Sequence, residues 1–350
     1  MASNPMQQFS VHKIGPEIKI AGIDLSFTNA SLFMFISMAL ILLFLFLMVQ
    51  ALVPIAKSSV SEPSEGPYIY ILGVAQDAGY PQAGCFKQHC MQGWMQKDKR
   101  LMATSLAVVD TANQRKYLFE ATPNLPEQLF LLELQAPEQE FELDGIFITH
   151  AHIGHYTGLM YFGREAMGSK NMPVYVMPKM REYLTSNGPW DQLVKLNNIA
   201  IKELSSQRKV DLGTISITPF LVPHRDEYSE TVGFKIKGPR KTALFIPDIN
   251  KWSEWSTDLA EEVQKIDYAF LDATFFDDME LPGRDISKIP HPFVTETMET
   301  LKDLTYEHKS KVWFIHMNHT NPLLDGDSLE SKLASDKGFR VATEGLRLPL

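Results

Sequence analysis

The sequence has little cysteine and no excess of positive charge, and each shortage excludes a class of protein. Two cysteines, Cys85 and Cys90, are too few for a disulfide scaffold, although they would permit one local bridge. The formal net charge of -9 repels phosphate backbones, which makes nucleic acid a poor candidate partner. The glycine-rich segment near residue 79 lacks the Lys-Ser/Thr ending of a phosphate-binding loop, so we discount nucleotide binding.

What is present is typical of a folded protein with one large domain. The 350 residues are 45% hydrophobic and 21% charged, which argues against wholesale disorder and against several membrane spans. A single uncharged stretch lies between Asp24 and Lys57, and its apolar part predicts one transmembrane helix at about residues 30–52. We therefore expect a single-pass protein of the bacterial inner membrane, with an anchor segment (1–56), a Ser-rich linker (57–66) and a globular domain (67–350).

The segments "NPMQQF" and "KIGPEIKIAGIDLSFTNASLFM" within the first 55 residues resemble the N-terminus of alphaproteobacterial ATP synthase subunit a. In that family this segment carries the first transmembrane helix. The later helices of the family have no counterpart in this sequence, so the resemblance implies an anchor and no proton translocation. A fusion artefact is the alternative.

Short β-branched or aromatic runs alternate with amphipathic stretches after the linker, which predicts a mixed α/β domain. Several predicted strands end in a histidine or an aspartate, and side chains at strand ends are well placed to form a site. The predicted strands lie at 68–74, 105–110, 116–121, 145–150, 216–222, 232–236, 242–248, 268–275 and 311–316, and the predicted helices at 124–133, 178–184, 257–264, 295–304 and 328–334.

Three histidines, His150, His152 and His155, follow one of these strands in the segment "FITHAHIGHYTGL". Neutral imidazole is a good ligand for zinc and iron, and a His-x-His pair in a turn can direct two nitrogens at one ion. This clustering predicts a metal site.

The segment resembles the His-x-His-x-Asp-His signature of the metallo-β-lactamase superfamily, whose fold is an αββα sandwich. The resemblance implies a first metal site with His150, His152 and His224, and a second with His155, Asp248 and His316, in which Asp248 bridges both ions. Zn²⁺, as one or two ions, is the expected cofactor, with Fe or Mn as alternatives. A metal-bound water would be the nucleophile, and Asp248 and Asp272 are the candidate catalytic residues that orient it.

Gly154 stands where the signature has its aspartate, so the second site lacks one ligand. Asp226, Asp272 or the spare His319 are the residues we expect to compensate in part. A weakened two-metal site, a one-metal site and a degenerate site remain alternatives. His291 follows Pro290 in a loop, and we predict a loop histidine there rather than a ligand.

The segments "ILGVAQDAGYPQAGCFKQHC" and "IHMNHTNPLL" resemble proteins similar to pyrroloquinoline quinone biosynthesis protein B (PqqB), a branch of the same superfamily whose cysteine cluster holds a structural zinc. Cys85, Cys90 and His89 would supply at most three of four ligands, so loop thiols or a local disulfide are alternatives.

Three functions follow from these residues. The first is a metal-dependent hydrolase of an ester, phosphodiester or lactone, the second a PqqB-like iron-dependent oxygenase, and the third a noncatalytic membrane-tethered binding module. The partner would be a small-molecule or peptide substrate, and a homodimer is left open.

Overall fold

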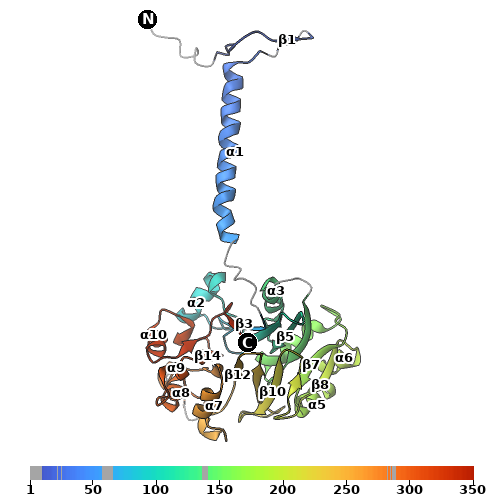
Figure 1. Ribbon diagram of the computed structural model, residues 1–350, viewed down its shortest axis with the longest axis vertical. Coiled ribbons are helices and arrows are strands. Elements are labelled where there is room, and N and C mark those ends of the chain that lie inside the picture. Colours follow the sequence, from blue (N-terminus) through green and yellow to red (C-terminus); the bar gives the residue numbers. More distant parts are fainter. Residues whose placement is uncertain are drawn as a thin grey trace. The chain divides into compact units, whose positions relative to one another are not determined.

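The computed structural model describes residues 10–21, 23–24, 26–56, 66–135, 141–281, 283, 285 and 289–350 (Figure 1). The chain divides into two compact units, Met1–Pro63 and Ser64–Leu350. Most of the predicted linker lies outside the described residues.

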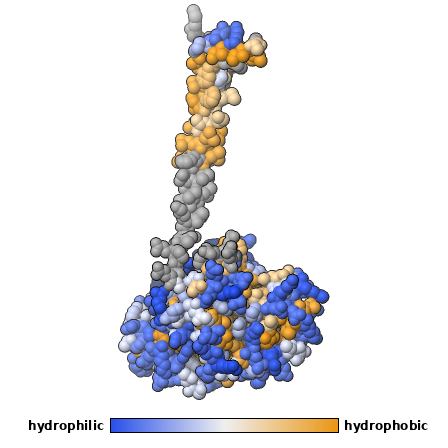
Figure 2. Space-filling model, turned by 45° about the vertical axis from the view of Figure 1, so that its right-hand side comes forward, coloured by the Kyte–Doolittle hydropathy of each residue, from blue (hydrophilic) through white to orange (hydrophobic). Residues whose placement is uncertain are grey.

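The first unit contains a short hairpin, β1 (Lys19–Ile20) and β2 (Ile23–Asp24), followed by the helix α1 (Asn29–Ala56). Figure 2 shows hydrophobic side chains over the part of α1 that is coloured. The expected membrane span at 30–52 is not supported, because no helix among the described residues is both long and apolar enough to cross a membrane.

The second unit is built from two seven-stranded sheets. The first sheet has the order β16-β3-β4-β5-β6-β7-β8, and its last four strands run parallel. Its strands are β3 (Tyr68–Gly73), β4 (Ser105–Asp110), β5 (Arg115–Phe119), β6 (Glu142–Phe147), β7 (Met172–Val176), β8 (Ile199–Glu203) and β16 (Arg347–Pro349).

The second sheet has the order β15-β14-β13-β12-β11-β10-β9, with β12 to β15 parallel. Its strands are β9 (Val210–Asp211), β10 (Ser216–Leu221), β11 (Val232–Lys237), β12 (Thr242–Ile246), β13 (Tyr268–Asp272), β14 (Val312–Ile315) and β15 (Arg340–Val341).

The sheets face each other across an aromatic core. The ring of Phe119 in β5 lies 5.5 Å from that of Phe234 in β11 and 6.2 Å from that of Phe245 in β12, measured between centroids. Helices cover the outer faces, and Figure 1 places α8 to α10 on one side of the strands and α5 and α6 on the other. This is the expected αββα arrangement. The helices are α2 (Gln88–Met95), α3 (Leu125–Gln135), α4 (Ile153–Tyr156), α5 (Pro178–Ser186), α6 (Trp190–Lys195), α7 (Leu259–Lys265), α8 (Val294–Thr300), α9 (Tyr306–Lys309) and α10 (Leu329–Asp336).

Both sheets present the carboxyl ends of parallel strands, and polar residues follow these ends directly. His150 comes after β6 in the first sheet, while Asp248 and His316 come after β12 and β14 in the second. Because the carboxyl ends of parallel strands lie at one edge of a sheet, the topology brings these residues to the same end of the sandwich.

Candidate metal centre

Four predicted ligands converge at the end of the two sheets. Nε2 of His150 lies 2.8 Å from Nδ1 of His152, which lies 3.3 Å from Nε2 of His224. The Asp248 carboxylate approaches the same point, with Oδ2 at 3.3 Å from His150 Nε2 and Oδ1 at 3.3 Å from His224 Nε2. Two bonds of about 2.1 Å at a tetrahedral angle separate their ligand atoms by roughly 3.4 Å, so this spacing matches one coordinated ion.

A second cluster adjoins the first through Asp248. Nε2 of His155 lies 3.6 Å from Asp248 Oδ2 and 3.5 Å from Oδ1 of Asp77. Nε2 of His316 lies 3.9 Å from the same oxygen of Asp77. Burial alone would raise the pKa of Asp77, but the imidazoles of His155 and His316 outweigh it and hold that pKa well below its usual range.

Each of these imidazoles turns one nitrogen to the centre and the other to an oxygen of the surrounding shell. This arrangement fixes the ring orientation and is characteristic of metal-binding histidines. The outer contacts join His150 Nδ1 to Thr149 Oγ1 (2.8 Å), His152 Nε2 to Glu227 Oε2 (3.1 Å), His155 Nδ1 to Glu120 Oε1 (3.5 Å), His224 Nδ1 to Asn250 Oδ1 (3.3 Å) and His316 Nδ1 to Thr274 Oγ1 (3.0 Å).

The centre also contains buried polar atoms without a hydrogen-bond partner. Nε2 of His155, Nε2 of His316 and Oδ1 of Asp248 are among them. A buried polar atom of this kind costs free energy unless something satisfies it, and all three atoms are metal-ligand types. The residues therefore fit a divalent ion.

The protonation of two central residues suits the same role. Burial and the neighbouring imidazole of His155 hold the pKa of His150 well below its ordinary value. Burial alone would raise the pKa of Asp248, but nearby imidazoles, that of His224 foremost, hold it well below its usual range. A neutral imidazole and an ionised carboxylate are the forms that bind a metal.

The predicted catalytic residue Asp272 lies at this centre, where its carboxylate is held by hydrogen bonds. It accepts from the backbone N–H of Ile249 (3.1 Å) and Thr274 (2.8 Å), and Oδ2 lies 2.8 Å from Nδ1 of His291. Asp226, which we expected to compensate in part for Gly154, lies outside the ligand clusters, and its carboxylate accepts a hydrogen bond from the hydroxyl of Thr231.

His291 lies in a loop, as the sequence predicted, and it belongs to none of the ligand clusters among the described residues, yet it reaches the centre. It is buried, and its Nδ1 lies 3.2 Å from Asp248 Oδ1 as well as beside Asp272. Burial would lower the pKa of His291, but these two carboxylates raise it to about 9. The Pro-His-Pro context indicated only a loop, and the packing of that loop is a tertiary feature.

His319 belongs to a separate cluster and does not complete the second site. Cys85, His89, Cys90 and His319 each offer one ligand atom, and these atoms all lie within 4.8 Å of one another. Both cysteines are free thiols, so the local disulfide is absent. Burial and the adjacent Cys85 raise the pKa of the Cys90 thiol to about 11. The sequence indicated Cys85, Cys90 and His89 as candidate ligands, and His319 lies beside them as a fourth side chain of a ligand type.

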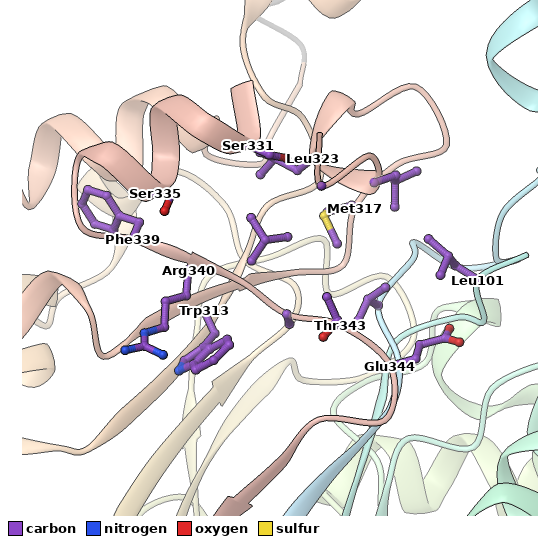
Figure 3. A pocket seen from close by; sticks show the side chains of 15 residues that line it. Leu101, Trp313, Met317, Leu323, Ser331, Ser335, Phe339, Arg340, Thr343 and Glu344 are labelled. Atoms are coloured by element: carbon purple, nitrogen blue, oxygen red, sulfur yellow. The ribbon is translucent and has the colours of Figure 1, made fainter. Parts of the chain in front are cut away.

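A cavity of about 1150 Å³ borders the second cluster through Asp77 and also borders the cysteine cluster, and it is the candidate place for a substrate. Gln76, Asp77 and Asn318 line it at the centre, and Cys85, His89 and His319 line it at the cysteine cluster. A smaller cavity of about 410 Å³ lies between β14, β15 and α10 (Figure 3). Its lining is mostly apolar and includes none of the clustered residues, so we assign the site to the larger cavity.

Comparisons with known proteins agree with the fold of the second unit. Residues 115–317 match the beta-lactamase superfamily domain. The coenzyme PQQ synthesis protein B of Xanthomonas campestris pv. campestris is 24% identical over 305 residues, which cover 81% of this chain and 99% of the relative. Among solved structures, Zn²⁺-bound PqqB from Methylobacterium extorquens aligns with a TM-score of 0.68 at 22% identity, covering 81% of this chain and all of that one. A diphosphatase of the PhnP family aligns with a TM-score of 0.55 at 20% identity, covering 81% and 96%.

Proposed function

The chain belongs to the beta-lactamase superfamily, and from this membership we propose that it is a metal-dependent hydrolase that cleaves an ester, phosphodiester or lactone bond. His150, His152 and His224 would hold one ion, His155 and His316 would contribute to a second, and Asp248 would face both. Zn²⁺ suits the nitrogen and oxygen donors, and Fe or Mn would also fit them. Such an ion, when bound, lowers the pKa of a coordinated water to about 7 and polarises the scissile group.

One observation supports the proposal most strongly. Each of the five central imidazoles has one nitrogen within 4.0 Å of a carboxylate oxygen of Asp248 or Asp77 and the other beside an oxygen of the surrounding protein. This repeated orientation is characteristic of metal-binding histidines.

Asp272 and His291 give the centre a means of moving a proton. Two carboxylates, Asp272 and Asp248, face Nδ1 of His291, which fixes the orientation of the ring. In the protonated ring the opposite nitrogen, Nε2, carries a proton that it can donate to a departing alkoxide. We therefore assign proton donation to His291, its positioning to Asp272, and the orientation of the attacking water to Asp248.

The cluster of Cys85, His89, Cys90 and His319 would hold a separate structural zinc. Two thiolates and two imidazoles are a complete tetrahedral ligand set for zinc. Such an ion would fasten the start of α2 to the segment after β14, and both of these elements line the cavity.

The test is elemental analysis of the purified chain, followed by a panel of phosphodiester, carboxylester and lactone substrates. We expect bound metal and turnover of one substrate class in the wild type, and less metal per chain together with loss of turnover in His150→Ala, which keeps the ligands of the cysteine cluster. His308→Ala is the matched control, since His308 lies in α9 away from the clustered histidines. Equal metal content in the wild type and His150→Ala would contradict the proposal.

The similarity to coenzyme PQQ synthesis protein B over 81% of the chain favours a second candidate, an iron-dependent oxygenase acting on a small molecule or peptide. The elemental analysis described above distinguishes the oxygenase from the hydrolase. Tightly held iron together with oxygen consumption favours the oxygenase, and zinc or manganese together with hydrolysis favours the first candidate. A noncatalytic binding module would bind metal and show neither activity.

A further inference from the structure

The second cluster contains a carboxylate that the histidine segment itself does not supply. Asp77 lies in the loop after β3, far from that segment in the sequence, yet its Oδ1 lies 3.5 Å from Nε2 of His155 and 3.9 Å from Nε2 of His316. Ligand atoms of these three residues all lie within 4.8 Å of one another. Both of these imidazole nitrogens are buried and lack a hydrogen-bond partner.

Asp77 and a side chain at position 154 exclude each other. A Cβ built on Gly154 would lie 2.4 Å from Cα of Asp77, 2.5 Å from its Oδ1 and 2.9 Å from its Cβ. Non-bonded atoms do not approach each other this closely. The shortest contact is with the backbone Cα of Asp77, which a side-chain rotation cannot move. Glycine at position 154 is therefore what allows Asp77 to occupy this place.

The backbone holds Asp77 in position from both sheets. The N–H of Gln76 donates to the carbonyl of Met317 (2.8 Å), directly after His316, and the N–H of Thr104 donates to the carbonyl of Ala75 (2.8 Å). Asp77 itself adopts φ +37°, in the left-handed region that non-glycine residues rarely adopt. Such strain persists only where the surroundings enforce it, and it is common at functional sites.

From these contacts we propose that Asp77 replaces, from a different loop, the carboxylate ligand that Gly154 cannot provide. Asp77, His155, His316 and Asp248 then form a complete second cation site with two imidazoles and two carboxylates. The Asp77 carboxylate lines the cavity of about 1150 Å³, so a substrate in that cavity would contact it. This inference rests on the proposed metal centre and specifies the composition of its second site.

The test is calorimetric titration of the metal-free full chain with Mn²⁺ and Zn²⁺, which reports the number of ions and their affinities without measuring activity. We expect Asp77→Asn to lose the weaker of the central ions, or to bind it at least about tenfold more weakly, with the other central ion unaffected. Glu330→Gln is the matched control, because it removes one negative charge from the lining of the same cavity outside the clusters.

A variant at position 154 tests the same fit from the other side. The Cβ of Gly154→Ala would lie 2.4 Å from Cα of Asp77, so the loop that carries Asp77 must shift, and we expect this variant to bind the same ion more weakly. A Gly154→Ala variant that binds both central ions as the wild type does would overturn the dependence of the site on Asp77 in this position, and circular dichroism would show that both variants are folded.

The outcomes separate this inference from the proposed function. If the wild type binds no ion that His150→Ala loses, the metal centre itself is wrong. If His150→Ala loses an ion while Asp77→Asn matches the wild type in number and affinity, the assignment of Asp77 is wrong and the metal centre stands.

Discussion

The Glu120 carboxylate faces Nδ1 of His155 across 3.5 Å, in a position where neither side chain is accessible to solvent. Glu120 follows β5 directly and adopts φ +75°, so the backbone takes an unfavourable conformation to place this carboxylate. The contact is an ion-pair distance and not a hydrogen bond, and it places the negative charge beside Nδ1 while Nε2 faces the centre.

Replacing Glu120 should therefore weaken metal binding although the residue is not a ligand. We expect Glu120→Gln to lower the affinity for the second ion by about 10- to 100-fold, because the amide orients the imidazole less strongly than the carboxylate does. Titration with Mn²⁺ measures the change. An affinity equal to that of the wild type would show that the ring is positioned by packing alone.

His291→Asn should slow hydrolysis mainly for substrates with poor leaving groups. General acid catalysis typically contributes about 10²- to 10⁴-fold, and an aryl leaving group such as p-nitrophenolate needs little of it. Comparison of kcat for p-nitrophenyl and alkyl esters of the same acid measures the effect. Metal content should remain that of the wild type, and an equal loss of kcat with both substrates would contradict proton donation by His291.

Asp272→Asn should reproduce this leaving-group dependence in a milder form, because Asp272 acts only by holding Nδ1 of His291. The variant also tests stability, since the Asp272 carboxylate accepts from two backbone N–H groups. An amide retains one acceptor oxygen, so we expect a loss of about 1–3 kcal/mol in the free energy of unfolding. Denaturant unfolding measures this loss, and a KM effect without a kcat effect would argue against a positioning role.

His319→Ala should remove one zinc per chain and expose thiols, while central metal binding persists. Thiol titration of the folded chain should show little reaction of Cys85 and Cys90 until a chelator is added, because metal-bound thiolates are protected. In His319→Ala both thiols should react without chelator. If the chelator changes nothing in the wild type, Cys85 and Cys90 are loop thiols that bind no zinc.

Glu344→Gln should stabilise the protein at neutral pH and not at acidic pH. Burial raises the pKa of Glu344 to about 7, at the edge of the small cavity in Figure 3, where its Oε1 accepts from the N–H of Met102. The folded state thus retains a proton that the unfolded state releases above about pH 4.5, and stability falls as pH rises from there to about 7.

Glutamine carries no ionisable group, so Glu344→Gln avoids this loss in the free energy of unfolding, which is at most about 3 kcal/mol. Denaturant unfolding at pH 5 and pH 8 measures the difference between variant and wild type, with the exposed Glu182→Gln in α5 as control. A gain of the same size at both pH values would mean that the charge on Glu344 is not responsible.

The sequence predicted much of this architecture because its signals are local. All nine predicted strands and all five predicted helices coincide with elements of the structure, since hydrophobic periodicity follows from the burial of one face. Five strands of the two sheets were missed. The strands β7 and β8 have short apolar runs that flank polar loops, and β9, β15 and β16 are only two or three residues long. The central residues His150, Asp248 and His316 could also be predicted locally, because each directly follows a predicted strand.

Residues that reach the site by tertiary packing were missed. Asp77 lies in a glycine-rich segment whose sequence gives no hint that it folds against His155. Glu120 did carry a signal, because it follows a predicted strand just as His316 does, and the rule applied to histidines and aspartates at strand ends would have included it.

The proposed ligands of the centre come from both sheets: His150 follows β6 of one, and Asp248 and His316 follow strands of the other. An ion held by these residues would cross-link the two sheets. A chain without the ion would have a lower free energy of unfolding, and the sheets would separate more often. Proteases act on such transient openings, so the amount of this protein in a cell should decline when metal is scarce, before any change in its synthesis.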